Sequence, residues 1–344
     1  MNVYKNCLDL IKKECRSWLI TGVGGFIGSH LAQTLLLCQQ RVIGIDNFST
    51  GKQENIKEIE SLLSHQQREN FTFFSGDIRD REFCFRLSEG IDVILHQAAL
   101  ASVPTSIENP LMTHDVNVTG FLNILEAARK NNARVVYASS SAIYGDASGL
   151  PKIETMPPAP LSPYGLTKLQ CEEYAALYTA LYNVHTIGLR YFNVFGPRQD
   201  PHGAYAAVIP AWINAYLTKK PALIYGDGEN TRDFCYIDNV VQANLLAAAT
   251  KNKNAFGLSF NVAGGYHLSL NELSAIIGDI ISEKVRLSAT TEPNYLPSRP
   301  GDIRHSYASL AFAKRELGYS PIVNMREGLE RTIQWFAKKK KVAQ

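Results

Sequence analysis

Short runs of apolar residues alternate along the first 195 residues with stretches in which apolar residues recur every three or four positions. The runs predict strands buried on both faces, and the spaced positions predict amphipathic helices. Strands are expected at Trp18–Thr21, Val42–Asp46, Phe71–Ser75, Val93–His96, Arg134–Ala138 and Val184–Arg190. Helices are expected from Phe26 through Leu35, in the charged stretch to about His65, around Arg81–Ser88, over Asn117–Lys130 and around Tyr164–Lys168. This alternation predicts a doubly wound α/β fold with a parallel sheet, whose ligands bind at the carboxyl ends of the strands.

Beyond residue 195 the pattern breaks into shorter segments. We therefore expect residues 1–195 to form the main, Rossmann-type domain, and residues 239–262 to return to its sheet. Residues 196–344 should form mainly a smaller, mixed lobe that binds the substrate. That lobe is predicted to end in a helix over Arg326–Lys341. The lysine run of this helix is expected to lie in solvent at the end of the chain.

The first 17 residues predict an additional helix, because Tyr4, Leu8 and Ile11 recur at helical spacing. Lys12 and Lys13 interrupt any signal-peptide core, so a packed outer helix is favoured over a targeting segment. No apolar run approaches the roughly 20 residues that a membrane span needs.

The composition is that of an ordinary globular enzyme, with 45% apolar and 19% charged residues in a chain of 344. A formal net charge of +3 is small for this length and predicts neither a nucleic-acid nor a membrane partner. The six cysteines are scattered without a C-x-x-C pair, and the eight histidines show no metal-ligand spacing. These patterns predict reduced thiols, a cytoplasmic setting and no metal.

A glycine-rich turn follows the first predicted strand, with glycines at positions 22, 25 and 28. Strand, glycine turn and helix together place backbone N–H groups and a helix N-terminus where a phosphate can bind. The second strand ends in Asp46, 18 residues after Gly28, where a ribose-binding carboxylate is expected. A glycine trio alone can be merely a tight turn, but this context favours a dinucleotide site.

Tyr164 and Lys168 lie four positions apart on a predicted helix, after a strand that opens into Ser139-Ser140-Ser141. A tyrosine with an ordinary pKa near 10 is a poor base at neutral pH, but a neighbouring ammonium stabilises a phenolate. Such a tyrosine can take a hydroxyl proton while hydride leaves the same carbon, with a serine holding the oxygen. A surface Tyr–Lys pair is the alternative, and the preceding glycine and serine motifs favour catalysis.

These motifs together resemble the extended short-chain dehydrogenase/reductases over nearly the whole chain and, within them, the nucleotide-sugar 4-epimerases. The resemblance rests on Thr21–Gly28, Asp46-Asn47, Gly76-Asp77-Ile78, His96–Ala99, Ser139–Gly145, Tyr164–Lys168 and Arg190–Asn193. It implies catalytic roles for Ser140, Tyr164 and Lys168, a tightly bound NAD and a homodimer built from two helices per subunit.

The resemblance also implies the residues that bind cofactor and substrate. Those expected to bind NAD are Gly22, Gly25, Phe26, Ile27, Gly28, Asp46, Asn47, Ser49, Thr50, Gly51, Asp77, Ile78, Gln97, Ala98, Ala99, Asn117, Tyr164, Lys168, Tyr191 and Val194. Those expected to bind a UDP-sugar are Ser102, Ser139, Ser140, Ser141, Asn193, Ala207, Val208, Tyr225, Arg232, Arg299 and Ser306. Planar, permanently charged guanidinium groups such as those of Arg232 and Arg299 suit a diphosphate.

A few positions in the sequence reduce the number of possible reactions and of possible sugar substrates. Dehydratases and decarboxylases of the family place acids just after the catalytic serine, whereas this chain has Ser141 and Ala142. In the family a small residue at the position of Ser306 is typical of enzymes that admit N-acetylated sugars. The sequence therefore resembles the bacterial UDP-N-acetylglucosamine 4-epimerases of surface-polysaccharide pathways. Alternatives are the UDP-glucose/galactose pair, a UDP-uronic acid with Arg304 as its cation, a net NAD-dependent oxidoreductase, and an NAD-binding regulator without activity.

Overall fold

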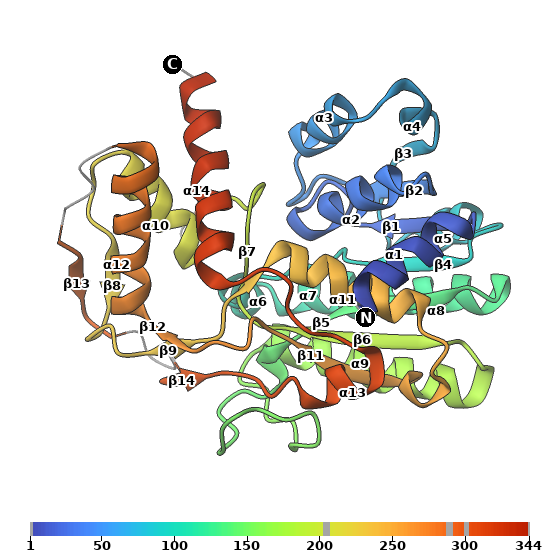
Figure 1. The fold of residues 1–344 in the computed structure, drawn as a ribbon. Helices are drawn as coiled ribbons and strands as arrows, with labels where there is room; N and C mark the ends of the chain where they lie inside the picture. Colours follow the sequence, from blue (N-terminus) through green and yellow to red (C-terminus); the bar gives the residue numbers. More distant parts are fainter. Residues whose placement is uncertain (1–2, 202–206, 287–291, 299–302, 343–344) are drawn as a thin grey trace.

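A computed structural model of the protein describes residues 3–201, 207–286, 292–298 and 303–342. A parallel sheet lies at its centre, with the strand order β11-β6-β5-β4-β1-β2-β3 (Figure 1). The strands are β1 (Ser17–Thr21), β2 (Arg41–Asp46), β3 (Phe71–Ser75), β4 (Val93–His96), β5 (Arg134–Ser140), β6 (Thr186–Tyr191) and β11 (Leu258–Val262). The order reverses between β1 and β4, where doubly wound sheets bind their ligands. The predicted fold class is confirmed.

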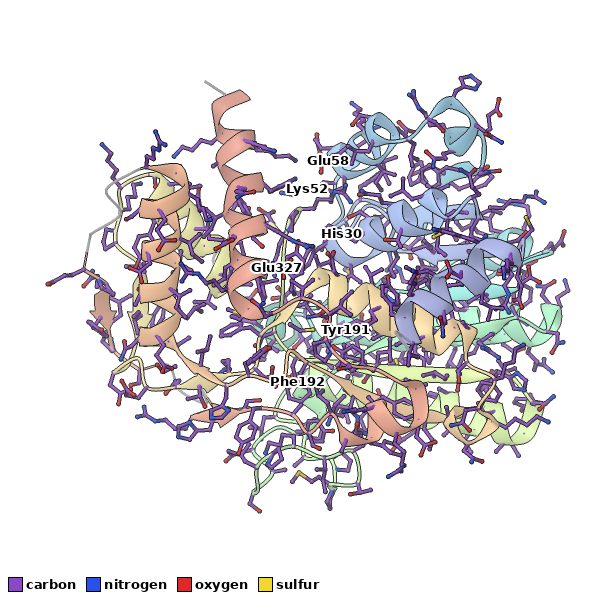
Figure 2. The ribbon with its side chains drawn as sticks, in the orientation of Figure 1. His30, Lys52, Glu58, Tyr191, Phe192 and Glu327 are labelled. Carbon is purple, nitrogen blue, oxygen red and sulfur yellow. The ribbon has the colours of Figure 1, made fainter. Side chains whose placement is uncertain are left out.

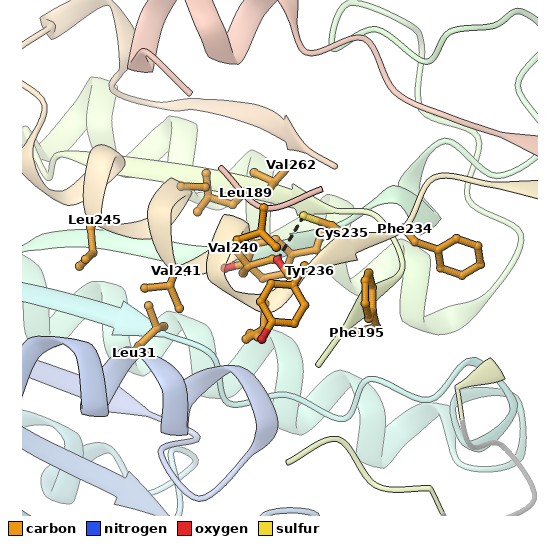
Figure 3. Packing of buried hydrophobic residues seen from close by; sticks show 14 of the residues in the cluster. Leu31, Leu189, Phe195, Phe234, Cys235, Tyr236, Val240, Val241, Leu245 and Val262 are labelled. Atoms are coloured by element: carbon orange, nitrogen blue, oxygen red, sulfur yellow. Dashed lines mark hydrogen bonds between the residues drawn. The ribbon is translucent and has the colours of Figure 1, made fainter. Parts of the chain in front are cut away.

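Helices cover both faces of this sheet, as the apolar spacing predicted. One face carries α1 (Val3–Lys13), α2 (Phe26–Leu37) and α11 (Ile237–Ala249), and the other carries α5 (Arg81–Leu87), α8 (Gly120–Asn131) and α9 (Pro163–Tyr182). Figure 3 shows part of the first core, where Leu189 and Val262 of the sheet pack with Val240 and Val241 of α11. Helix α1 buries Cys7 and Ile11 against α11, so the predicted outer helix is present.

The structure differs from the expected elements in four places, one of which is β6, which begins at Thr186 instead of Val184 and ends at Tyr191. The predicted helix over 117–130 is preceded by α6 (Val103–Glu108), α7 (Pro110–His114) and a π-helical turn over Asp115–Thr119. The charged stretch divides into α3 (Gln53–Leu62) and α4 (His65–Glu69), because Ser64 starts a new helix with a capping box. Strand β5 extends two residues further than expected and includes Ser140.

The chain beyond residue 195 adds short strands and four further helices in the described ranges. The strands are β7 (Val194–Phe195), β8 (Leu223–Tyr225), β9 (Thr231–Arg232), β10 (Cys235–Tyr236), β12 (Leu268–Ser269), β13 (Asn294–Leu296) and β14 (His305–Ser306). The helices are α10 (Val208–Leu217), α12 (Leu270–Ile280), α13 (Ala311–Leu317) and α14 (Met325–Val342). Helices α10, α12 and α14 gather in one region, away from the large sheet (Figure 1). Helix α13 instead contacts β11 and α11, and the exact domain boundaries remain predictions.

The remaining expectations concern the state of the cysteines, a metal site and a membrane span. All six cysteines are free, and only Cys15 is exposed. Within the described ranges, no cluster of three or more His, Cys, Asp or Glu side chains could hold a metal ion. None of the helices described is long and apolar enough to cross a membrane.

Candidate active site

The glycine turn joins β1 to α2 at very close range. Gly22 has a φ of +72°, and a Cβ built on it would lie 2.8 Å from the backbone nitrogen of Ala98. A Cβ on Gly28 would lie 2.2 Å from the carbonyl oxygen of Gly22. Only glycine fits at these two positions, so the first turn of α2, with Phe26 and Ile27, starts directly above the strand end. Its N–H groups form the cradle that the sequence predicted for a phosphate.

Asp46 lies beside this turn at the end of β2. Its carboxylate oxygens accept hydrogen bonds from Gly24 N (2.9 Å) and Phe48 N (2.7 Å), and the residue is 8% exposed. Burial raises the pKa of this carboxyl, whereas the backbone N–H groups act to lower it. Gly51 packs against the same carboxylate, because a Cβ there would lie 2.7 Å from both of its oxygens. The acid is therefore held in one position at the cavity.

A cavity of about 80 Å³ opens above the ends of β1 to β4. Most of the predicted NAD-binding residues meet there. Its lining is Gly22, Gly25, Ile45, Asp46, Asn47, Ser49, Thr50, Gly76, Asp77, Ile78, Gln97, Ala98, Ala99 and Val116. Asn117 does not line it. Its buried side chain instead bonds both backbone groups of Leu100 and the Thr167 hydroxyl, so it supports the loop after β4.

Asp77 is fixed at the edge of this cavity by two neighbours. Arg79 binds its carboxylate through two guanidinium nitrogens at 3.0 and 2.8 Å, and Asn47 donates to it at 2.8 Å. The hydrogen bonds from Arg79 lower the pKa of Asp77 to about 2. An ionised, immobile carboxylate thus stands beside Ile78.

The three predicted catalytic residues lie at the end of β5 and in the first turns of α9. Ser140 is the last residue of β5, is 9% exposed, and accepts a hydrogen bond from Ala142 N (3.1 Å). Lys168 is buried, donates to Ala138 O (2.9 Å), and places its ammonium 6.0 Å from the ring centre of Tyr164. The helix that carries both residues therefore sits directly on the strand that carries the serine.

Two contacts fix the start of α9 beside the serine. The backbone N–H of Tyr164 donates to Ser106 Oγ at 3.1 Å. A Cβ built on Gly165 would lie 2.8 Å from Ala142 O, so the helix approaches the turn after β5 more closely than a side chain would allow. Tyr164 is half-buried at this junction. Burial lowers the pKa of nearby His96 to about 3, and the Lys168 ammonium acts in the same direction.

Tyr191 connects the two halves of the site at the end of β6, in the middle of the molecule (Figure 2). Its hydroxyl donates to Gln97 Oε1 (3.1 Å) and accepts a hydrogen bond from Asn244 (2.9 Å). In register it pairs with Ser140 on β5. The end of β6 thus contacts both Gln97, which lines the first cavity, and Ser140 on the neighbouring strand.

Ser139, which was expected to bind the UDP-sugar, has its side chain inside the protein. Its side chain is 2% exposed, and its hydroxyl donates to Glu172 Oε1 at 2.6 Å, inside the protein. Because successive residues of a strand point to opposite faces, Ser139 points away from the side that Ser140 serves. The hydroxyl of Ser139 therefore belongs to a buried network with Glu172 and Arg190, and a substrate contact of this residue stays a prediction.

A second cavity, of about 470 Å³, lies between the end of β6 and the region of α10 and α12. It brings together five of the predicted substrate residues and the cofactor candidate Val194. Its lining is Val103, Pro104, Asn193, Val194, Phe195, Gln199, Ala207, Val208, Ile209, Trp212, Leu223, Tyr225, Arg232, Phe234 and Leu270. Of the other candidates, Ser102 caps α6 next to this lining, and Ser141 begins the turn after β5. Arg299 lies outside the described residues.

Ser306 does not line this cavity itself but stands next to Arg232, which does. Strands β14 and β9 run parallel, and Ser306 is the register partner of Arg232. Arg304, the cation considered for a uronic acid, instead binds Asp227 with both terminal nitrogens at 2.7 and 2.8 Å.

Asp233 is a functional candidate that the sequence reasoning did not assign, although it follows Arg232 directly. It is fully buried, and its carboxylate accepts hydrogen bonds from Gly264 N, Gly265 N and Ala308 N at 2.9 to 3.3 Å. Burial raises its pKa to about 7. This residue ties the loop after β11 to the segment after β14.

The sequence matches the NAD dependent epimerase/dehydratase family over residues 18–263. A putative UDP-glucose 4-epimerase from Methanocaldococcus jannaschii is 38% identical over 320 residues, covering 92% of this chain and 97% of that relative. A UDP-N-acetylglucosamine 4-epimerase from Methanobrevibacter ruminantium M1, solved with UDP-N-acetylmuramic acid, has a TM-score of 0.86 and 36% identity, covering 95% and 99% of the two chains. A UDP-glucuronic acid 4-epimerase from Bacillus cereus, solved with UDP-glucuronic acid and NAD, has a TM-score of 0.82 and 34% identity, covering 94% and 99%.

Proposed function

The chain belongs to the NAD dependent epimerase/dehydratase family, and on that premise we propose that it interconverts UDP-N-acetylglucosamine and UDP-N-acetylgalactosamine. The three relatives described above are named as UDP-sugar 4-epimerases, and the one from Bacillus cereus was solved with NAD. The observation that carries the proposal is the anchoring of α9 on β5: the Lys168 ammonium lies 6.0 Å from the ring centre of Tyr164 and donates to Ala138 O, two residues before Ser140 at the end of that strand.

The residues present fit NAD. Gly22 and Gly28 leave no room for a Cβ, which brings the backbone within reach of a pyrophosphate, and Asp46 faces the same cavity. A carboxylate at this position accepts hydrogen bonds from the ribose hydroxyls and repels a 2′-phosphate, which favours NAD over NADP. The bound cofactor would supply a reversible acceptor for the hydride of the sugar's C4.

The chain's own residues handle the proton and the sugar oxygen. Tyr164 takes the proton of the C4 hydroxyl as the hydride leaves, and it returns a proton when the hydride comes back. Ser140 holds the C4 oxygen by a hydrogen bond, and the Lys168 ammonium keeps positive charge beside the tyrosine. Inversion requires the 4-keto sugar to present its other face between the two hydride transfers, while the nucleotide stays bound.

The second cavity supports the assignment of the substrate. Arg232 and Asn193 line it and would bind the diphosphate, and Arg299 keeps its predicted role as a second arginine there. Ser306 adds only a small side chain next to Arg232. A small residue leaves space for the acetamido group as the keto sugar turns, which favours the N-acetylated pair.

UDP-glucose and UDP-galactose form the second candidate pair, because a relative at 38% identity carries the name of a UDP-glucose 4-epimerase. A UDP-uronic acid is less favoured. Its carboxylate needs a cation, and the guanidinium of Arg304 is already bound by Asp227 and by Asn230 Oδ1.

Product analysis separates these candidates. The purified protein, without added cofactor, is incubated with each UDP-sugar in turn, and the 4-epimers are separated by chromatography. We expect conversion of the N-acetylated pair, together with release of about one NAD per subunit when the protein is denatured. Conversion of only the glucose pair or only a uronic acid would refute the proposed substrate. Net, stoichiometric consumption of added NAD would refute epimerisation.

The oligomeric state and the cellular location of the protein are also proposals. Apolar side chains lie exposed on α7 and α9, with Leu111 at 85%, Leu177 at 52% and Leu181 at 66% exposure. Apolar residues gathered on neighbouring helices favour a helix–helix interface between two copies. A cytoplasmic location is proposed from the free, mostly buried cysteines.

A further inference from the structure

A buried hydrogen-bond network lies behind the proposed catalytic residues and takes no part in the proton steps at Tyr164. Its centre is the ion pair of Glu172 on α9 and Arg190 on β6, joined by two bonds of 2.9 and 2.7 Å. Each side chain is only 10% exposed. Removing two charges from water is costly, so a pair in this position needs further partners to be tolerated.

The network joins α9 and β6 to β5, to the turn after β5 and to β11. Glu172 also accepts the hydroxyl of Ser139 at 2.6 Å. Arg190 also donates to the hydroxyl of Tyr144 at 2.8 Å, and that hydroxyl donates to Asn261 on β11 at 2.7 Å. Ser140 lies between Ser139 and the turn that leads to Tyr144.

Strand register explains why these groups converge. Ser139 on β5 pairs with Arg190 on β6, so both side chains point to the same face of the sheet, the one that α9 covers. Glu172 lies one helical turn after Lys168 and thus on the same side of α9. Lys168 bonds to Ala138 O, and Glu172 bonds to Ser139. Two successive turns of α9 are therefore fixed to two successive residues of β5.

We propose that Glu172 and Arg190 are positioning residues, which hold helix α9 and the end of β5 in the relative placement that lets Tyr164, Lys168 and Ser140 act together. The inference rests on the proposed function and deepens it. Proton transfer requires its partners within hydrogen-bond reach, and a displacement of about 1 Å can lower a rate roughly 100-fold. Neither residue touches the substrate in this role.

Two variants separate positioning from simple stability. Glu172→Gln keeps an oxygen that can accept the Ser139 hydroxyl, but it leaves the buried charge of Arg190 without a counter-charge. The double variant Glu172→Met/Arg190→Met removes both charges with side chains of similar length, but it leaves Ser139 without its acceptor. Replacing a buried ion pair by apolar groups is often neutral for stability, whereas removing one partner is strongly destabilising.

The proposal predicts that the two variants rank in opposite order by melting temperature and by kcat. Glu172→Gln should have the lower melting temperature but keep kcat within about tenfold of wild type, because the bond to β5 persists. The double variant should melt closer to wild type but lose about 10- to 100-fold in kcat, with KM within a few-fold. A kcat that simply follows melting temperature across the variants would overturn the proposal, as would a double variant with wild-type kcat.

Ser139→Ala and Ser259→Ala form the matched pair of controls. Ser259 shares a hydrogen bond of 3.2 Å with the Tyr137 hydroxyl, on the same strand β5 but without any bond to α9. Ser139→Ala should lower kcat by about tenfold, and Ser259→Ala should leave it within about twofold, at similar melting temperatures. Equal losses in both would contradict a specific role of the bond between α9 and β5.

A readout without substrate distinguishes failure of this inference from failure of the proposed function. Amide hydrogen exchange should become faster at 138–142 and at 163–172 in the double variant, even where its melting temperature recovers. Unchanged exchange in both segments would overturn the inference, whatever the activity. A wild-type protein that converts no UDP-sugar would refute the proposed function, and the exchange measurement would still decide the inference.

Discussion

Gly165→Ala tests the close contact between α9 and the turn after β5 with a single added methyl group. The new Cβ would lie 2.8 Å from Ala142 O and 3.1 Å from Pro160 Cβ, and ordinary contact begins at 3.4 Å. Helix and turn must therefore separate by about 0.6 Å. Ala142 N is bonded to Ser140 Oγ, so the shift is passed directly to the serine.

The expected size of the effect can be worked out from this overlap. Forcing a methyl group into a packed contact costs about 1–3 kcal/mol, of which the better helix propensity of alanine offsets about 0.5–1 kcal/mol. We expect Gly165→Ala to lose up to about 2.5 kcal/mol in unfolding free energy and about 10- to 100-fold in kcat. NAD content after denaturation should be unchanged, because the contact lies away from the glycine cradle.

Gly278→Ala is the control for the helix propensity. Gly278 lies in α12, and a Cβ built there would meet no other atom within 4 Å. This variant should be more stable by about 0.5–1 kcal/mol and keep wild-type kcat. The assays are urea unfolding and initial rates of UDP-sugar epimerisation. A Gly165→Ala protein with kcat within about twofold of wild type would refute the argument that this contact positions the serine.

Three further predictions concern single side chains. Tyr164→Phe should lower kcat by about 100- to 10,000-fold at an unchanged melting temperature, and more than a tenth of wild-type activity would contradict the proton route. Ser306→Tyr should lower kcat/KM for the N-acetylated pair by at least about tenfold and spare the glucose pair; equal effects on both would remove the proposed role of Ser306. Arg79 lowers the pKa of Asp77 to about 2, so their interaction stabilises the fold above about pH 4 and is lost as pH falls toward 2. The stability difference between wild type and Arg79→Gln should accordingly shrink across that range in acid-unfolding curves, and a constant difference would refute it.

Local patterns were sufficient to predict the large sheet. A parallel strand that is buried on both faces must be apolar throughout, and such runs in the first 195 residues mark strands of that sheet. Strand β3 is the exception, because it lies at the edge of the sheet and is largely exposed. The glycine turn and Asp46 were also predictable, because their spacing along the chain fixes their meeting in space. The helices at 103–114 were missed, since each is only five or six residues long and shows no sustained period.

Tertiary pairing decided what the sequence could not predict. The short strands of the second region pair with segments far away in the chain, as β9 does with β14, and two residues carry no periodic signal. The resemblance singled out Ser140 for catalysis, but only the pleat of β5 shows that the hydroxyl of Ser139 points to the opposite face of the sheet. Asp233 became recognisable only once the loops that donate to it were placed around it.

The Tyr–Lys spacing is informative in this chain because of the acid that lies one turn further along the same helix. Tyr164, Lys168 and Glu172 succeed one another at one-turn intervals, from the open site to the buried face of the sheet. A carboxylate one turn from Lys168 would compete for its ammonium if it were free. Arg190 binds that carboxylate with two nitrogens, so the Lys168 ammonium is left to Ala138 O and to the neighbourhood of Tyr164. The arginine on β6 thus leaves the Lys168 ammonium available for the role proposed for Tyr164, which a spacing rule confined to α9 cannot reveal.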